Sequence, residues 1–233
     1  MLDQSKIRVV GFDADDTLWA NEMIFRDAEE EIAGLLSEFE VAHVVQKQMF
    51  GVEMANLERY GYGIKGFTLS MVELALEVSA GRVPAATVGA ILDIGKRMLT
   101  APVEVLDGVR DTLAALQPRY RLVVVTKGDL LDQERKLERS GLMPHFHHTE
   151  VVSNKRPGDY ARALRRMDIA PEEFVMVGNS LKSDVLPLLD IGAQAVHVPY
   201  HVTWAHEEAT PAPDARYLEL SHIGQLTARL LPD

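Results

Sequence analysis

The sequence contains no cysteine among its 233 residues. Disulfide bonds, thiolate nucleophiles and cysteine-based zinc sites are therefore excluded, and nothing in the composition requires an oxidising compartment. No apolar run is long enough to cross a bilayer, and the first residues lack the basic and apolar regions of a signal peptide. We therefore expect a soluble, cytoplasmic protein with no membrane partner.

Basic residues are also scarce, because 24 Lys and Arg face 35 Asp and Glu and leave a formal net charge of −11. An acidic surface offers no counter-charge to nucleic acid or to an anionic membrane, so neither partner is expected. The apolar fraction of 47% is ample for a core. We expect a globular monomer or homodimer that acts on a small molecule.

The most informative stretch is an apolar run that starts at Ile7 and ends in three carboxylates, Asp13, Asp15 and Asp16. A short run rich in Val and Ile is typical of a buried parallel strand, and open α/β sheets place their sites at the carboxyl ends of such strands. Two carboxylates at one strand end repel each other, which indicates either a bound cation or a carboxyl held protonated for acid catalysis. An isolated Asp-x-Asp-x-Thr pattern is equally compatible with an acidic turn that caps a strand.

Two kinds of periodicity divide the chain. Residues 20–100 carry apolar side chains at helical spacing and predict a separate domain of four helices. From Pro102 onward, strand and helix patterns alternate, which predicts a parallel sheet with helices on both faces. The predicted organisation is therefore an α/β core of residues 1–19 and 101–233, with an inserted helical domain of residues 20–100. A loop of three glycines inside the insert offers Tyr62 and Lys65, either to a substrate or merely as a connector.

Polar residues of the type that a phosphoryl-transfer site needs follow three further predicted strands. In chain order they are Thr126 with Lys127, Lys155, and Asn179 with Asp184. With Asp13 and Asp15, these positions match in order the four motifs of the haloacid dehalogenase-like (HAD) hydrolase superfamily, which the chain resembles over nearly its whole length. The insertion directly after the first motif is similar to the α-helical cap of phosphoglycolate phosphatase-like enzymes and 2-haloacid dehalogenases. The resemblance implies a doubly wound, Rossmann-like parallel sheet with a helical cap domain.

A catalytic role can be argued for each of these motif residues. Asp13 is expected to be the nucleophile that takes the phosphoryl group, although metal ligation alone is an alternative. Asp15 is expected to protonate the leaving alcohol and then to deprotonate the attacking water. Lys155 is expected to supply positive charge, and Thr126 and Lys127 to contact the substrate.

The same resemblance implies a magnesium site. The expected ligands of Mg²⁺ are Asp13, the main-chain carbonyl of Asp15, Asp184 and Asn179. Many relatives have Asp where this chain has Asn179. We therefore expect a lower affinity for the metal, or a larger dependence on Asp184.

Two further departures from the family pattern affect the site. Asp16 stands where Gly is common, which a turn tolerates. Lys155 is followed by Arg156 and Pro157, so Arg156 is an alternative candidate for the cation that contacts phosphate. Lys155 is preferred because the helix signal after Pro157 keeps it at the turn between strand and helix.

Two other clusters have plain structural interpretations. The three histidines at positions 145, 147 and 148 lie on a weak strand without spaced carboxylate partners, so we do not expect a metal site there. The segment 200–208 follows a core strand, and it is interpreted as the rim of the site, a structural latch or a subunit contact.

The sequence thus predicts a Mg²⁺-dependent phosphatase that hydrolyses a small phosphorylated metabolite through an aspartyl-phosphate. A 2-haloacid dehalogenase would use the same nucleophile but needs neither Asp15 nor Asp184. A phosphomutase would share all four motifs. A catalytically weak binding or regulatory protein is the remaining alternative, because Asn179 replaces a carboxylate.

Overall fold

The computed structural model describes residues 2–213 and 215–231, and the chain forms two compact units. The α/β unit comprises Met1–Glu22, Val103–Lys127 and Gln133–Asp233, and the helical unit comprises Met23–Pro102 with Gly128–Asp132. The predicted division of the chain into core and cap differs from these bounds mainly at 128–132. That the helical unit acts as a cap stays a prediction.

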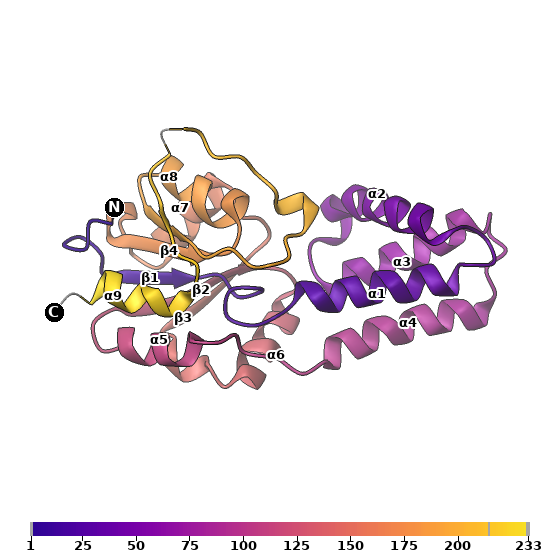
Figure 1. The fold of residues 1–233 in the computed structure, drawn as a ribbon, viewed down its shortest axis with the longest axis horizontal. Coiled ribbons are helices and arrows are strands. Elements are labelled where there is room, and N and C mark those ends of the chain that lie inside the picture. Colours follow the sequence, from indigo (N-terminus) through magenta and orange to yellow (C-terminus); the bar gives the residue numbers. More distant parts are fainter. Residues whose placement is uncertain (1, 214, 232–233) are drawn as a thin grey trace. The chain divides into compact units, whose positions relative to one another are not determined.

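A six-stranded, wholly parallel sheet forms the centre of the α/β unit (Figure 1). Its strands are β1 (Val9–Phe12), β2 (Arg121–Lys127), β3 (His148–Val152), β4 (Phe174–Gly178), β5 (Gln194–His197) and β6 (Leu218–Glu219). Their order in the sheet is β3-β2-β1-β4-β5-β6. The predicted α/β fold class is confirmed.

The described helices lie between these strands in the chain, except α9, which follows β6. They are α1 (Glu22–Leu35), α2 (Ala42–Tyr60), α3 (Ile64–Val78), α4 (Ala85–Thr100), α5 (Val109–Leu116), α6 (Leu130–Ser140), α7 (Pro157–Arg166), α8 (Leu186–Asp190) and α9 (Leu226–Leu230). Two shorter elements also matter for the site, the π-helical turn η3 (Leu181–Val185) and the 3₁₀ turn η4 (Ala205–Glu207).

The alternation of side chains along the strands builds two cores. Val10 and Phe12 of β1 pack with apolar residues of α5, α6 and α9, whereas Val9 packs with residues of α7 and α8 on the opposite face. Figure 1 shows the same division, with α7 and α8 on one side of the sheet and α5, α6 and α9 on the other. Burial on both faces explains why β1 and β4 are apolar throughout.

The side of the sheet to which the chain adds strands changes at β1. The chain adds β2 and β3 on one side of β1 and then places β4, β5 and β6 on the other. Phe12 lies opposite Val124 of β2 and Val177 of β4, so β1 and β4 end at nearly the same level and β2 extends three residues further. In open α/β sheets, ligands bind outside the carboxyl ends of the strands at such a reversal. The residue at this point is Asp13.

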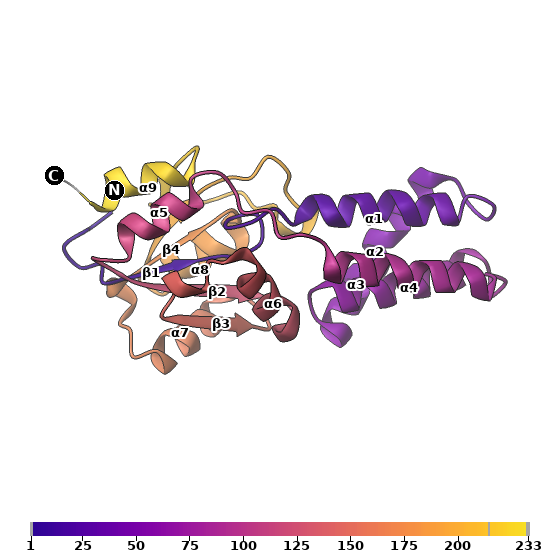
Figure 2. The ribbon, with the colours of Figure 1, turned by 90° about the horizontal axis from the view of Figure 1, so that it is seen from below.

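The helical unit consists mainly of α1, α2, α3 and α4 (Figure 2). All four helices contribute to a separate apolar cluster, which includes Ile32, Met49, Leu74 and Ile91. The predicted glycine loop is shorter than expected, because α2 ends at Tyr60 and α3 already begins at Ile64. Gly66 is helical, and its missing Cβ leaves room for the carbonyl of Gly61, which lies 2.8 Å from where a Cβ would be. Lys65 therefore lies in the first turn of a helix, not in a loop.

None of the helices among the described residues combines the length and the apolar character that a membrane span requires.

Candidate active site

Asp13 lies directly after β1 and is buried, with 7% of its surface exposed. Its main-chain N–H donates to the carbonyl of Val177 at 2.9 Å, which continues the pairing of β1 with β4 by one residue. Its carboxylate accepts a hydrogen bond from the ammonium of Lys155, which is also buried. The strand end therefore presents a carboxylate already paired with a cation.

Lys155 joins Asp13 to a second buried carboxylate. Its Nζ donates to Asp184 Oδ1 at 2.6 Å. The competing candidate, Arg156, is exposed, and its main-chain N–H donates to Asp159 at the start of α7. The structure thus places Lys155, and not Arg156, between the two carboxylates.

Asp184 is held by the turn that follows β4. The π-helical turn η3 brings the N–H of Ser180 to Asp184 Oδ2 at 3.1 Å, and the hydroxyl of Tyr160 lies 3.4 Å from Oδ1. Gly178 is required here, because a Cβ at that position would lie 2.3 Å from Asp184 Cγ. The glycine of the fourth motif therefore makes room for the carboxylate of the same motif.

Burial and the neighbouring charges act together on the pKa values of this cluster. Burial and the negative charge of Asp184 raise the pKa of Asp13, against the opposing effect of Lys155. Burial alone would lower the pKa of Lys155, but the two carboxylates outweigh it and raise that pKa. The ammonium is thus held charged, and one positive charge balances only one of the two carboxylates.

The carboxylate of Asp15 is turned toward groups that the sequence does not reveal. Its Oδ1 accepts from the indole N–H of Trp19 at 2.7 Å and from Lys136 Nζ at 3.0 Å. Its Oδ2 accepts from the amide of Gln133 at 2.8 Å. Gln133 and Lys136 are both buried residues of α6. The proposed acid and base is therefore enclosed by three donors.

Asp16 has a structural role in this turn. Its φ of 59° is left-handed, which explains why a glycine suits this position. Its carboxylate accepts from the main-chain N–H groups of Asn21 and Glu22, at the start of α1. Burial raises the pKa of Asp16 to about 6, against the effect of these two donors. The third carboxylate of the first motif thus stabilises the beginning of a helix.

Thr126 and Lys127 end β2 at the same edge of the sheet, but their side chains differ in their contacts. Thr126 is buried, and its hydroxyl makes a long contact of 3.4 Å to the carbonyl of Lys127. The ammonium of Lys127 donates to Ser183 at 3.0 Å and forms an ion pair with Glu207 of η4. The structure thus joins Lys127 to the segment 200–208, and its predicted contact with substrate stays a prediction.

Asn179 is half-buried beside the first motif. Its Oδ1 lies 3.4 Å from the hydroxyl of Thr17, and its main-chain carbonyl lies 3.0 Å from Nε2 of the buried His197. The ring of His197 also contacts Glu219. These contacts hold the turn that carries Asn179.

The residues at this edge of the sheet have the oxygen ligands that Mg²⁺ prefers. Asp13 and Asp184 are buried carboxylates that share one lysine, so a divalent cation would offset their remaining negative charge. Among residues 2–213 and 215–231, no group of three or more His, Asp or Glu side chains is arranged to hold a metal, and this includes the three histidines near β3. The carbonyl of Asp15, Asn179 Oδ1, substrate oxygens and water would have to complete the shell. Mg²⁺ retains water and uses few carboxylates, so the residues fit a hydrated magnesium ion.

Tyr62 and Lys65 belong to the helical unit. The ammonium of Lys65 lies 2.9 Å from both carboxylate oxygens of Asp129, which is part of the same unit. Their predicted contact with substrate stays a prediction.

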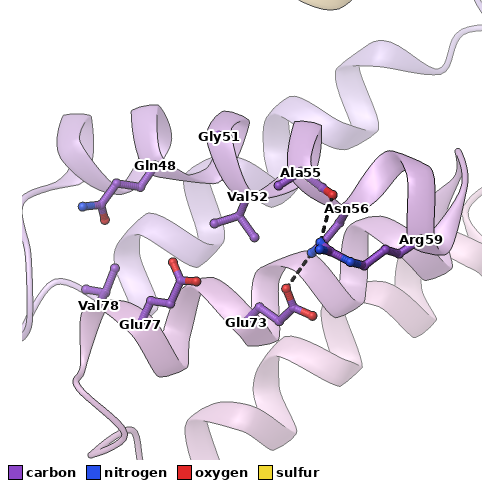
Figure 3. A pocket seen from close by; sticks show the side chains of 9 residues that line it. All are labelled: Gln48, Gly51, Val52, Ala55, Asn56, Arg59, Glu73, Glu77 and Val78. Atoms are coloured by element: carbon purple, nitrogen blue, oxygen red, sulfur yellow. Dashed lines mark hydrogen bonds between the residues drawn. The ribbon is translucent and has the colours of Figure 1, made fainter.

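A groove of about 550 Å³ also lies in the helical unit, between α2 and α3 (Figure 3). In it, the amide of Asn56 donates to Glu73 at 2.7 Å, and Arg59 and Glu77 line the walls. None of the residues that line this groove is a predicted catalytic, metal or substrate residue. We therefore assign no chemistry to it.

Sequence reasoning missed Gln133, Lys136, Tyr160 and Glu207. The only signal for the first two is the polarity of α6, whose sequence places polar residues at positions 132, 133 and 136, on the face that is buried. Tyr160 lies within an ordinary apolar helix face, and Glu207 was part of a segment with three open interpretations. Their partners are distant in the sequence, so no local pattern identifies them.

Known proteins resemble this chain over most of its length. The chain is 28% identical over 234 residues to a glyceraldehyde 3-phosphate phosphatase of Methanothermobacter thermautotrophicus, which covers 94% of this chain and 98% of that protein. A crystal structure of a haloacid dehalogenase-like family hydrolase from Xanthomonas campestris has 42% sequence identity and a TM-score of 0.86, and covers 97% of this chain and 91% of its own.

A 2-haloacid dehalogenase from Pseudomonas syringae pv. Tomato shares the fold alone, with 20% identity, a TM-score of 0.64, and coverage of 96% of this chain and 98% of its own. The sequence profile of the haloacid dehalogenase-like hydrolases matches residues 7–192, a range that contains Asp13, Lys155 and Asp184. This protein therefore belongs to the haloacid dehalogenase-like hydrolase family.

Proposed function

We propose that this protein is a Mg²⁺-dependent phosphatase that hydrolyses a small phosphorylated metabolite through an aspartyl-phosphate on Asp13. The observation that carries the proposal is the buried ammonium of Lys155 between Asp13 and Asp184, with the carboxylate of Asp15 two residues after the nucleophile. Since the relative from Methanothermobacter thermautotrophicus is a glyceraldehyde 3-phosphate phosphatase, glyceraldehyde 3-phosphate is the first substrate to test.

In the first step, a carboxylate oxygen of Asp13 attacks phosphorus and the bond between phosphorus and the ester oxygen breaks. Asp15, in its protonated form, gives its proton to the departing alkoxide, so that a neutral alcohol leaves. Lys155 offsets the negative charge that the phosphoryl group brings beside two carboxylates. The hydroxyl of Thr126 is an available donor to a phosphoryl oxygen, because its own contact is long.

In the second step, water attacks the phosphorus of the aspartyl-phosphate. Asp15, now ionised, takes the proton of this water while the bond between phosphorus and the Asp13 oxygen breaks. Inorganic phosphate leaves, and both aspartates return to their starting states. Splitting one displacement into two is what a carboxylate nucleophile contributes.

Asp13, the carbonyl of Asp15, Asp184 and Asn179 would hold Mg²⁺, which supplies positive charge to a phosphoryl oxygen when bound. The remaining steps depend on the protein. Lys155 keeps Asp13 in place, and the turn of η3 keeps Asp184 fixed through the N–H of Ser180.

The rival activities differ in what they require of Asp15. A dehalogenase releases halide, which needs no proton, so it has no need of a carboxyl two residues after the nucleophile as an acid. A phosphomutase uses the same first step but returns the phosphoryl group to a sugar. A regulatory protein would show no turnover.

The test is a panel of phosphorylated metabolites, with 2-haloacids as a control, in the presence of Mg²⁺ or of excess chelator. We expect release of inorganic phosphate from at least one ester, and no release of halide. Halide release without phosphate release would replace the proposal by a dehalogenase. An isomeric sugar phosphate as product would replace it by a mutase, and no turnover of any ester would favour a binding protein.

A further inference from the structure

Helix α6 packs Leu137 into the core of the α/β unit, but it also buries two long polar side chains while two of its leucines are exposed. Leu130 and Leu131 are 58% and 45% exposed, whereas Gln133 and Lys136 are only 4% and 7% exposed. Lysine is among the residues least often buried, because removing its charge from water is unfavourable unless it is paired. The burial of Gln133 and Lys136 therefore needs a reason other than core packing.

The buried ammonium of Lys136 has two acceptors in the turn after β1. It donates to Asp15 Oδ1 at 3.0 Å and to Asn21 Oδ1 at 2.7 Å. The side chains of Lys136 and Asp15 are 9% and 24% exposed, so the pair is largely shielded from solvent. Lys136 thus connects the carboxylate of Asp15 to the side chain of Asn21, six residues later in the chain.

Gln133, one turn earlier on the same face of α6, holds the other oxygen of Asp15. Its amide nitrogen donates to Asp15 Oδ2 at 2.8 Å. Its amide oxygen is buried and is without a hydrogen-bond partner among the residues that the structure describes. The opposite amide orientation would point that oxygen at a carboxylate. The contact with Asp15 is therefore made although it leaves a buried acceptor unsatisfied, which is destabilising.

We infer that Gln133 and Lys136 are positioning residues for Asp15, an inference that rests on the proposed function. Proton transfer to a leaving alcohol requires the carboxyl within hydrogen-bond distance of the ester oxygen. Contacts to both carboxylate oxygens restrict the rotation of the Asp15 side chain, and the rigid helix α6 supplies two of them. Trp19 supplies the third.

The test compares two phosphate esters whose leaving groups differ in their need for a proton. The value of kcat/KM reports the steps up to the release of the alcohol. Glycerol phosphate releases a basic alkoxide that needs the proton of Asp15, whereas 4-nitrophenyl phosphate releases a stable phenolate that does not. A misplaced Asp15 should therefore slow the first ester much more than the second, and a general structural defect should slow both.

The variants are Lys136→Met and Gln133→Leu, which remove the donors at similar size. Their matched controls are Arg135→Met and Glu134→Leu, at exposed neighbours on the same helix. We expect kcat/KM for glycerol phosphate to fall about 10- to 100-fold, and that for 4-nitrophenyl phosphate less than about 3-fold. The controls should match the wild type with both esters, and Lys136→Arg should recover part of the loss.

The outcomes separate the inference from the function. If the wild type hydrolyses both esters and the variants lose activity equally with the two, or lose none, the positioning role is wrong while the phosphatase remains. If the wild type hydrolyses no phosphate ester, the proposed function fails first. If Lys136→Met does not fold, Lys136→Arg and Gln133→Leu test the positioning role. The measurement is again the loss of kcat/KM for glycerol phosphate relative to the loss for 4-nitrophenyl phosphate.

Discussion

Glu207 forms an ion pair with Lys127, a residue eighty positions earlier in the chain, and both side chains are largely buried. The same carboxylate accepts from the hydroxyl of Ser180, which precedes η3, and from that of Ser183, which lies within η3 next to Asp184. Lys182 adds a contact, since its ammonium donates to the carbonyl of His206 at 2.6 Å. Of the three interpretations of the segment 200–208, a structural latch agrees best with these contacts.

The buried carboxylate of Glu207 should make the free energy of unfolding depend on pH in the acidic range. Burial opposes ionisation of Glu207, but Lys127 and the two serine hydroxyls outweigh it and lower its pKa to about 2. A carboxyl with a depressed folded-state pKa contributes stability above its unfolded pKa of about 4.5, and the contribution is lost as pH falls through that value toward 2. From pH 6 to pH 3 the loss should be about 2 kcal/mol.

The measurement is urea denaturation of wild type and Glu207→Gln across this pH range. The variant should be less stable at pH 6, and the difference from wild type should shrink by about 2 kcal/mol at pH 3. Glu208→Gln, at an exposed neighbour, should follow the wild type at every pH. A difference that stays constant with pH would contradict the role of this ion pair.

Asp15→Asn should separate the two chemical steps. The substitution keeps the size of the side chain and leaves the main-chain carbonyl in place, so substrate binding should persist. Proton transfer contributes about 10²- to 10⁴-fold in rate, and turnover should fall by that order. With 4-nitrophenyl phosphate, Asp13 should still be phosphorylated and then remain so, because no base activates water.

Mass spectrometry of quenched Asp15→Asn protein checks this. We expect a phosphate-sized increment on the peptide that contains Asp13, and its loss when Asp13 is also replaced. Wild-type turnover of the best ester by Asp15→Asn would exclude Asp15 as acid and base.

Metal dependence should change when the missing carboxylate is restored. Asn179→Asp adds a negative charge at a proposed ligand of Mg²⁺, and should lower the concentration of Mg²⁺ needed for half-maximal activity. Titration of activity with Mg²⁺ in both proteins measures the shift. Full activity of the wild type in excess chelator would rule out the metal altogether.

Gly178→Ala should impair the active site by displacing the carboxylate of Asp184. The added Cβ would meet Asp184 Cγ at 2.3 Å, so the carboxylate must move. A displacement of about 1 Å at such a site can cost about 100-fold in rate. Gly89→Ala, in α4, is the matched control, because a Cβ there meets nothing within 4 Å. Steady-state kinetics and thermal unfolding should show loss for the first variant alone.

Tyr62 and Lys65 should affect which substrate is preferred. Contacts with the non-reacting part of a substrate act through binding energy, so alanine at either position should alter KM or the ranking of substrates more than the rate with a minimal ester. A phosphate-release panel with both variants tests this. Lys96→Ala, which removes an exposed lysine of α4, serves as the control. An unchanged ranking would remove both residues from the substrate site.

The sequence by itself determined the sheet and the residues at its edge. Alternating apolar strands and helices predict a parallel sheet, because burial and backbone pairing follow local periodicity. Asp13, Lys155 and Asp184 could be placed together because the carboxyl ends of parallel strands meet at one edge, and they meet in the structure. The extent of the glycine loop could not be predicted from the sequence, since Lys65 is helical and the close approach of the Gly61 carbonyl to Gly66 leaves no local pattern.

Only the tertiary structure decided which side chains surround Asp15 and Lys127. Gln133, Lys136 and Glu207 contact partners 118, 121 and 80 positions away in the chain. A helix whose buried face is polar cannot be recognised from hydrophobic periodicity, because its buried residues resemble those of a solvated face. Their burial depends on partners that supply compensating charge, and those partners are brought together only when the sheet and α6 have packed.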